Sequence, residues 1–139
     1  MKLFHMINEA GVHQHGLVPR ICDTAFGLNA LVKKGVAAGS VAVTSAATDI
    51  PTGLCAMPPD QAGDTVTIER LTAQSTKLVK LGGDVSEEDW LIPAADGTAA
   101  KLPTDAGTYY VFGKALSAGV SGQVIEAETF APRPVVVGE

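Results

Sequence analysis

Apolar residues in this sequence recur at alternate positions within short segments, and glycine-containing turns separate these segments. In the segment DTVTIERL, for example, Val66 and Ile68 fall on one face while threonine and glutamate fall on the other. This period of two is typical of half-buried strands, and short strands at regular spacing indicate a small β-barrel or sandwich. The segments that we expect to be strands are residues 39–46, 64–71, 76–81, 89–102, 108–116 and 122–130.

No long amphipathic helix interrupts this pattern, so we do not expect an α/β sheet. Residues 1–20 mix His, Gly and Pro without a sustained period, which indicates an irregular N-terminal arm. Residues 23–35 predict a short helix, with Asp23 or Thr24 as its N-cap and Gly35 at its end. We therefore expect a mainly β fold with an N-terminal arm and possible short helix over 1–34, a β-barrel over 35–130, and an extended tail over 131–139.

Two stretches of the sequence are similar to each other. Residues 51–71 and residues 111–130 each have an apolar segment with a glycine, then an Ala- and Gly-bearing turn, then an alternating segment. Gly53 corresponds to Gly113 and Gly63 to Gly122, and residues 39–49 are similar to residues 88–97. The pattern predicts two similar β-units that close on each other into one barrel, which would remove exposed sheet edges. Chance similarity among Ala, Gly and Val segments is the alternative.

The turns and the C-terminal tail carry further local signals. Asp96-Gly97 is typical of a tight hairpin turn between two strands within residues 89–102. In the tail, Pro132 and Pro134 favour an extended backbone. Val135, Val136 and Val137 could then add a strand to an exposed sheet edge, or the terminus could be frayed.

Composition and charge narrow the classes of function. The 139 residues suit one domain, or one domain with an arm. The net charge of −5 and the isolated pair Lys33 and Lys34 argue against a general nucleic-acid binder, because phosphate contacts need clustered cations. Charged residues make up 18% of the sequence and aromatic residues 5%, so the surface has few charged groups. Apolar patches exposed on such a surface would favour a protein partner.

The two cysteines do not form a disulfide framework, and we interpret Cys22 and Cys55 as small buried apolar residues. The N-terminal segment has no apolar run of signal-peptide length. No window approaches the roughly 20 apolar residues of a membrane span. We expect a soluble protein that is made in a reducing cytoplasm and has no membrane partner.

Candidate catalytic and metal-binding residues are few. His5, His13 and His15 lie in the arm and lack the further ligands of a zinc site. Glu87, Glu88 and Asp89 are typical of a solvated turn. Cys22 has no local nucleophile motif, and no phosphate-binding or nucleophile-elbow motif is present. Lys101 follows the Asp96-Gly97 turn along the next strand, whereas a lipoyl- or biotin-carrying lysine stands at the tip of the turn. We therefore predict no catalytic residues, no metal site, no cofactor and no enzymatic activity.

The order of segments in the second half resembles a known family. A GGD turn is followed by WLIPAADGTA and then by AGTYYVFGKALSAGVSGQVIEAETF. This order resembles the head decoration, or capsid cement, proteins of tailed bacteriophages, in which an Ala-Asp-Gly turn precedes a Gly-Xaa-Ala-Leu strand, a Gly turn and an alternating strand. The resemblance covers roughly residues 35–130. The residues that fit are Gly113, Ala115, Leu116, Gly122 and Val124.

The resemblance implies a small, β-tulip-like barrel on the outer surface of a phage capsid. It also implies a homo-oligomer, often a trimer, that bridges neighbouring major capsid protein subunits and stabilises the virion. The alternative is a non-catalytic β-barrel module that binds a carbohydrate or a peptide. Sugar sites usually present exposed aromatic rings, whereas we expect the aromatic residues here to be mostly core. They are Trp90, Tyr109, Tyr110, Phe112 and Phe130.

Overall fold

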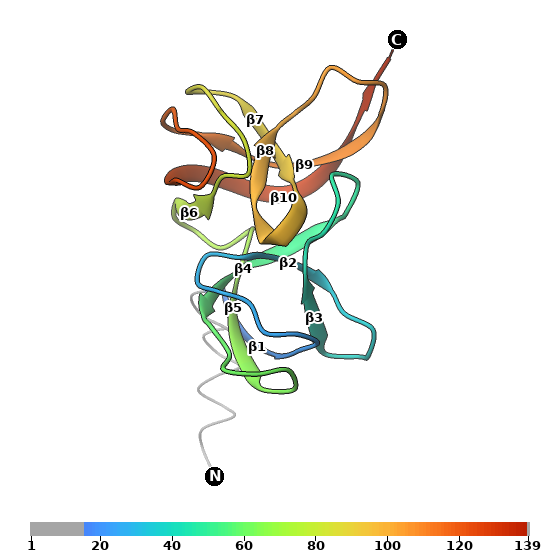
Figure 1. Cartoon of the computed structure of the whole chain (residues 1–139), viewed down its shortest axis with the longest axis vertical. Helices are drawn as coiled ribbons and strands as arrows, with labels where there is room; N and C mark the ends of the chain where they lie inside the picture. The colour runs from blue at the N-terminus through green and yellow to red at the C-terminus, as the bar shows by residue number, and fades with distance from the viewer. Residues whose placement is uncertain (1–15, 139) are drawn as a thin grey trace.

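The computed structural model describes residues 16–138 and shows a mainly β protein in which two units are stacked along the long axis (Figure 1). The first unit is a closed barrel with strand order β1-β3-β2-β4-β5, and the second is a five-stranded sheet with order β6-β10-β9-β7-β8. The strands are β1 (Leu17–Cys22), β2 (Leu31–Lys34), β3 (Ser40–Val43), β4 (Pro51–Met57), β5 (Thr65–Arg70), β6 (Lys77–Lys80), β7 (Trp90–Pro93), β8 (Ala99–Lys101), β9 (Gly107–Ala115) and β10 (Val124–Val137).

The two units have the same topology. In the first, β1 pairs parallel with β3 and antiparallel with β5, while β2 pairs with β3 and β4 and β4 pairs with β5. In the second, β6 pairs with β10, β7 pairs with β8 and β9, and β9 pairs with β10. A parallel bridge between Leu81 and Ala99 links the two ends of this sheet, as β1 and β3 are linked in the first unit. The chain is therefore a tandem repeat of one five-stranded unit.

Backbone geometry at the glycines confirms the correspondence predicted from the sequence. The amide of Gly63, at φ +89°, donates to the carbonyl of Cys22, and the amide of Gly122, at φ +90°, donates to that of Leu81. A left-handed φ at both turns favours glycine there. The predicted similarity of residues 39–49 to residues 88–97 is wrong, because Trp90–Pro93 is the counterpart of β2 and not of β3.

At Gly53 and Gly113, a side chain would collide with the backbone of the neighbouring strand in the same way in both units. A Cβ atom on Gly53 would lie 2.7 Å from the carbonyl oxygen of Glu69, and one on Gly113 would lie 2.7 Å from that of Glu128. Because the obstacle is backbone of the paired strand, neither side can move without disturbing the sheet. Only glycine lets the two strands approach this closely.

We expect Gly53→Ala and Gly113→Ala each to lower the free energy of unfolding by about 1–3 kcal/mol, the usual cost of forcing extra atoms into a packed site. Urea denaturation of both variants measures the loss. Gly83→Ala is the matched control, since a Cβ there meets nothing within 4 Å. Similar stability of all three variants would contradict the shared role of Gly53 and Gly113.

One of the buried clusters joins the two units. The interior of the first barrel is filled by Cys22, Val32, Val41, Cys55, Val66 and Ile68. Leu31, Leu54 and Leu71 of the first unit instead join a buried cluster with residues of the second, among them Leu91 and Phe112. The units are thus held together by apolar packing as well as by the chain that links them.

Polar contacts fix the turn between β7 and β8 against the first unit. The hydroxyl of Thr44 donates to the carbonyl of Ala94 at 3.0 Å, and the amide of Gly97 donates to the carbonyl of Thr44 at 3.1 Å. Asp96 and Gly97 both have positive φ, at 58° and 72°, as the predicted Asp-Gly hairpin turn requires. The predicted turn is therefore confirmed, and it lies at the junction of the units.

The structure corrects the predicted ends of the barrel. Residues 31–34 form strand β2, so the helix predicted over 23–35 is wrong, and β1 places residues 17–22 in the barrel rather than in an arm. Leu31 and Val32 are both buried, one toward the second unit and one inside the barrel, which removes the alternation that marks a strand. Residues 131–137 continue β10 and pair with β9, so this segment belongs to the second unit.

Candidate interaction surface

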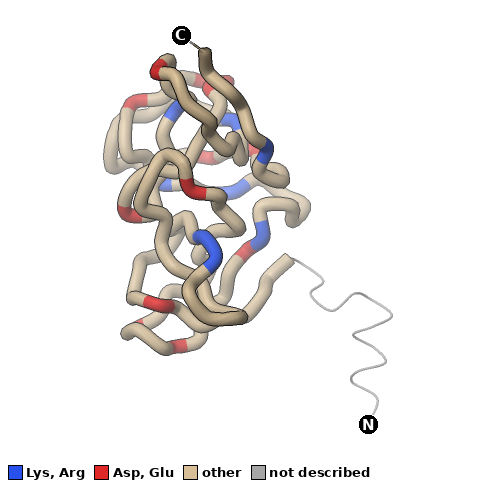
Figure 2. The backbone as a smooth tube through the Cα atoms, turned by 90° about the vertical axis from the view of Figure 1, so that its right-hand side faces the viewer, with Lys and Arg blue, Asp and Glu red and all other residues tan. Residues whose placement is uncertain are grey.

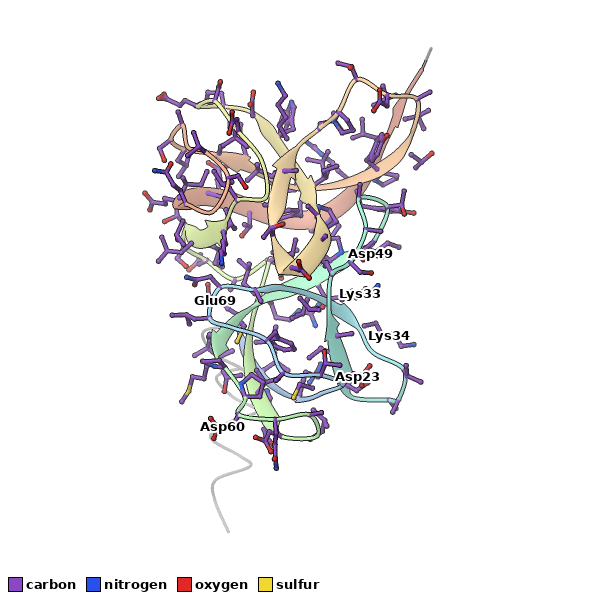
Figure 3. All side chains as sticks on the ribbon, viewed as in Figure 1. Asp23, Lys33, Lys34, Asp49, Asp60 and Glu69 are labelled. Carbon is purple, nitrogen blue, oxygen red and sulfur yellow. The ribbon has the colours of Figure 1, made fainter. Side chains whose placement is uncertain are left out.

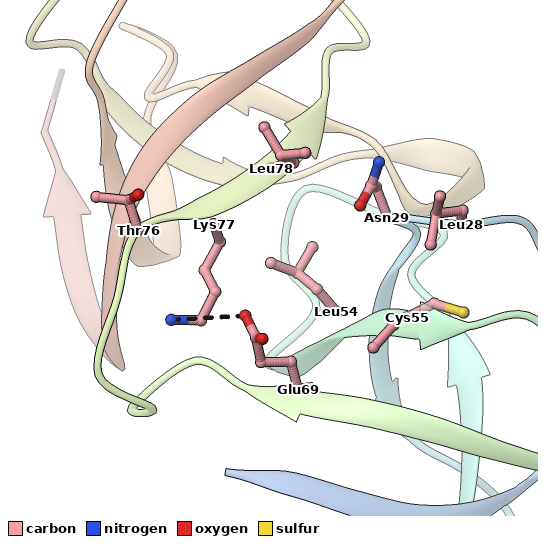
Figure 4. Close-up of a pocket in the computed structure, with 9 residues that line it drawn as sticks. Leu28, Asn29, Leu54, Cys55, Glu69, Thr76, Lys77 and Leu78 are labelled. Carbon is pink, nitrogen blue, oxygen red and sulfur yellow. Dashed lines mark ion pairs between the residues drawn. The ribbon is translucent and has the colours of Figure 1, made fainter. Parts of the chain in front are cut away.

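A pocket of about 360 Å³ lies at the junction of the two units (Figure 4). Its lining includes Leu54 and Glu69 from the first unit and Thr76, Lys77 and Leu78 from the second. Lys77 is 3% exposed, and its ammonium group donates to the carbonyls of Ala73 at 2.8 Å and Ser75 at 2.7 Å. The Glu69 carboxylate lies 3.7 Å from the same nitrogen. These bonds engage the ammonium, so Lys77 ties the second unit to the first.

The two cysteines are buried free thiols, which confirms the sequence-based interpretation. The Cys22 thiol donates to the carbonyl of Gln61 at 3.3 Å. Burial raises the pKa of the Cys55 thiol to about 11, so this thiol stays protonated at neutral pH. Because the thiolate is the reactive form, Cys55 is a poor nucleophile although it borders the junction pocket.

A second hollow, of about 230 Å³, also lies between the units. It is bordered by Ile50, Arg70 and Thr72 of the first unit and by Tyr110 and Pro132 of the second. Its lining has one charged side chain and no carboxylate, which gives it no acid–base pair. Like the junction pocket, it is a gap where two barrel units meet.

The largest exposed aromatic side chain is Trp90, which begins β7 and is 42% exposed. Its ring meets that of Phe130 edge to face, with centroids 6.1 Å apart. Arg133 lies 5.1 Å from the centroid of the Trp90 ring and 4.8 Å from that of Phe130. The two rings and the guanidinium thus form one packed group on the surface.

Strand pairing places two charged side chains beside this group. Lys114 pairs with Trp90 across β9 and β7, and Glu128 pairs with Lys114 across β10 and β9. The Lys114 ammonium lies 5.8 Å from the centre of the Trp90 ring and 2.7 Å from the Glu88 carboxylate, and the hydrogen bond to Glu88 raises the pKa of Lys114. We call the surface formed by Trp90, Lys114, Glu128, Phe130 and Arg133 the Trp90 face.

Beside the Trp90 face is a shallow, mainly apolar hollow of about 250 Å³, lined by Trp90, Leu102, Val111, Arg133 and Val135. A half-exposed Trp next to an Arg is the combination that dominates the energy of many protein–protein contacts. The sequence predicts that Trp90 is one of the core aromatic residues. Phe112 is fully buried and Tyr109 is 8% exposed, as expected, but Trp90 faces outward.

Elsewhere the charged side chains are distributed over both units, and blue and red segments are interspersed in Figure 2. Lys33 pairs with Asp49 at 3.1 Å, and the two lie together in Figure 3, with Lys34 on the same strand. In the described residues, no three His, Cys, Asp or Glu side chains gather in a group that could hold a metal ion. Within residues 16–138, no helix has the length and apolar character that crossing a bilayer requires.

The other residues singled out in the sequence have structural surroundings. Glu88 holds Lys114, and the Asp89 carboxylate accepts a hydrogen bond from the amide of Ser86 at 2.8 Å. Lys101 ends β8, away from the turn at Ala95–Gly97, as the sequence indicated. His5, His13 and His15 lie outside the described residues.

The fold is a tandem of a closed β-barrel and a five-stranded sheet of the same topology, and its most distinctive exposed feature is an aromatic and cationic face. Its fold is similar to that in the crystal structure of the head fiber gp8.5 N base in bacteriophage phi29, with a TM-score of 0.67. The match has 18% sequence identity and covers 84% of this chain and 95% of that chain. At this identity the likeness shows a shared fold. No protein-family model and no curated protein matches the sequence.

Proposed function

We propose that this protein is a structural protein of a bacteriophage virion. In this proposal it decorates the outer surface of the capsid and stabilises it by bridging neighbouring major capsid protein subunits. The observation that carries the proposal is the shared fold with a phage head fiber base over 84% of the chain. The resemblance of residues 35–130 to capsid decoration proteins, noted from the sequence, supports the same class of protein.

The physical properties of the chain suit this role. The barrel and the second β-unit share one buried cluster, which gives a stiff body that can be repeated many times on a shell. The Trp90 face is rich in aromatic and cationic side chains, and protein–protein interfaces are enriched in aromatic residues and arginine. We propose that the major capsid protein is one partner and that the chain itself, as a homo-oligomer, is another.

Cosedimentation with capsid shells tests this function. The shells are assembled from the major capsid protein of the phage whose genome encodes this chain. We expect saturable binding and an increase in the melting temperature of the shells, because a ligand that binds only the assembled state stabilises it. An unrelated β-barrel protein of similar charge is the control. Absence of binding at micromolar concentrations of both partners would contradict the proposed function.

The exposure of Trp90 favours one alternative, a module that binds carbohydrate. Sugars stack on the open face of an aromatic ring, and Trp90 is the one exposed ring of this size in the sequence. However, Arg133 and Lys114 both lie over this ring and would have to move for a sugar to stack. A glycan array with specific, saturable binding that is lost in Trp90→Ala would favour this alternative.

A further inference from the structure

The internal repeat shows which residues of the second unit correspond to the covered surface of the first. The carbonyl of Leu31 accepts a hydrogen bond from the amide of Thr44, and the carbonyl of Trp90 accepts one from that of Leu102. Strand pairing then aligns a row of residues in one unit with a row in the other. The first row is Leu31, Leu54 and Glu69, and the second is Trp90, Lys114 and Glu128.

In the first unit this row is covered by the second unit. Leu31 is 1% exposed and Leu54 is 4% exposed, and both belong to the cluster that also holds Phe112. At the end of the row, the carboxylate of Glu69 forms an ion pair with the second unit, because the ammonium of Lys77 lies 3.7 Å from it. The occupant of this face in the first unit is therefore another barrel of the same fold, which supplies apolar side chains and one cation.

In the second unit the corresponding row is open. Trp90 is 42% exposed, and the carboxylate of Glu128 faces solvent. Leu71, which follows β5 and is 1% exposed, corresponds to the partly exposed Phe130. The Trp90 face thus stands where the first unit has an interface, and no element within residues 16–138 covers it.

We propose that the Trp90 face is the surface through which two or three copies of this chain contact one another. This inference rests on the proposed function and names the surface that would form the oligomer. The face carries the cations Lys114 and Arg133 together with the carboxylate of Glu128, so its charges complement those of a second copy of itself. A Trp and an Arg at the centre of such a contact supply most of its energy.

Head-to-tail stacking of copies, by contrast, is disfavoured. In such a stack the first unit of the next copy would have to supply the cation that Lys77 supplies within the chain. The residue that corresponds to Lys77 is Val18, since Val18 pairs with Ile68 as Lys77 pairs with Ala127. Valine has no charge to offer Glu128. Copies that meet by this face around a symmetry axis can instead bring Arg133 of one copy beside Glu128 of the next, and such an arrangement closes on itself.

The single Trp of the sequence makes this contact directly observable. We expect the purified full chain to exceed its monomer mass of 14.3 kDa in light scattering behind a sizing column. On dilution, the emission of Trp90 should shift to longer wavelength and become more accessible to iodide, with the same midpoint as dissociation. Trp90→Ala and Arg133→Glu should each raise the dissociation constant at least about 10-fold, as loss of a central contact residue does.

Val36→Asp is the matched control, because Val36 is 96% exposed in the turn after β2 and belongs to the first unit, whereas the Trp90 face belongs to the second. It should leave the dissociation constant unchanged, and melting temperatures check that each variant folds. A wild-type chain that stays monomeric with constant Trp90 emission at all concentrations would overturn the inference. An oligomer that persists in both Trp90→Ala and Arg133→Glu would overturn it as well.

Adding capsid shells separates this inference from the proposed function. If Trp90 emission responds to shells but not to protein concentration, the occupant of the face is the shell, so self-association fails while the proposed function stands. If the chain forms an oligomer through the face but never binds shells, the inference stands and the proposed function fails.

Discussion

Replacing Phe112 with alanine is expected to lower the free energy of unfolding by about 3–5 kcal/mol, the range measured for buried Phe→Ala changes. Phe112 has no exposed surface and is among the largest fully buried side chains. It belongs to the cluster in which Leu31, Leu54 and Leu71 of the first unit meet residues of the second. The cavity left by the ring would therefore weaken both units at once.

Urea denaturation followed by circular dichroism and by Trp90 fluorescence measures this effect. Because the core is shared, we expect both signals to report a single transition that moves to lower urea. Val136→Ala is the control, since Val136 is 76% exposed on β10 and its loss should cost less than about 0.5 kcal/mol. Two separate transitions, with Phe112→Ala affecting one of them, would show that the units fold independently.

The strands that were predicted well are those with one face buried and one face in solvent. Val66 and Ile68 are 1% and 2% exposed inside the barrel, as their alternation indicated. The period of two fails where both faces of a strand are buried, and β2 is such a strand because the second unit covers its outer side. A run of apolar residues near a capping residue then resembles a short helix.

The sequence predicted the correct correspondence between the two units at positions where the backbone geometry requires glycine. It predicted a wrong correspondence where the two segments were similar only in their small residues. Gly53 and Gly113 each stand against a carbonyl of the neighbouring strand, so the requirement survives in both units. Residues 39–49 and 88–97 both contain Ala and Asp, but they do not occupy corresponding places in the two units. The sequence also predicted that the two units close on each other, whereas the first unit forms a closed barrel by itself.

The Trp90 face could not be predicted from the sequence alone. A Trp at the start of an apolar strand is usually interpreted as core, and the corresponding residue of the first unit, Leu31, is indeed buried. What distinguishes the two positions is the neighbour, because Leu31 has a second barrel against it and Trp90 has none within the described chain. The exposure of Trp90 therefore depends on how the two units are arranged, and the local sequence around Trp90 does not encode it.

Replacing Lys77 with methionine is expected to lower the free energy of unfolding by about 2–4 kcal/mol, although methionine has similar length and is apolar. The cause is the loss of two hydrogen bonds from a charged donor, each worth about 1.5–3 kcal/mol, less what water regains. The Lys77 ammonium donates to the carbonyls of Ala73 and Ser75 and lies beside the Glu69 carboxylate, which is 30% exposed and therefore partly solvated. Methionine leaves these acceptors at the junction without their cation.

The matched control is Lys80→Met, three residues further along β6 on its exposed face, and it should change stability by less than about 0.5 kcal/mol. Adding Glu69→Gln to Lys77→Met should recover part of the loss, because removing the second charge relieves the carboxylate left without its partner. Urea denaturation of the single and double variants gives the coupling between the two residues. Equal stability of Lys77→Met and Lys80→Met would mean that water replaces the ammonium at no cost, and the buried lysine would then add nothing to the apolar packing that joins the two units.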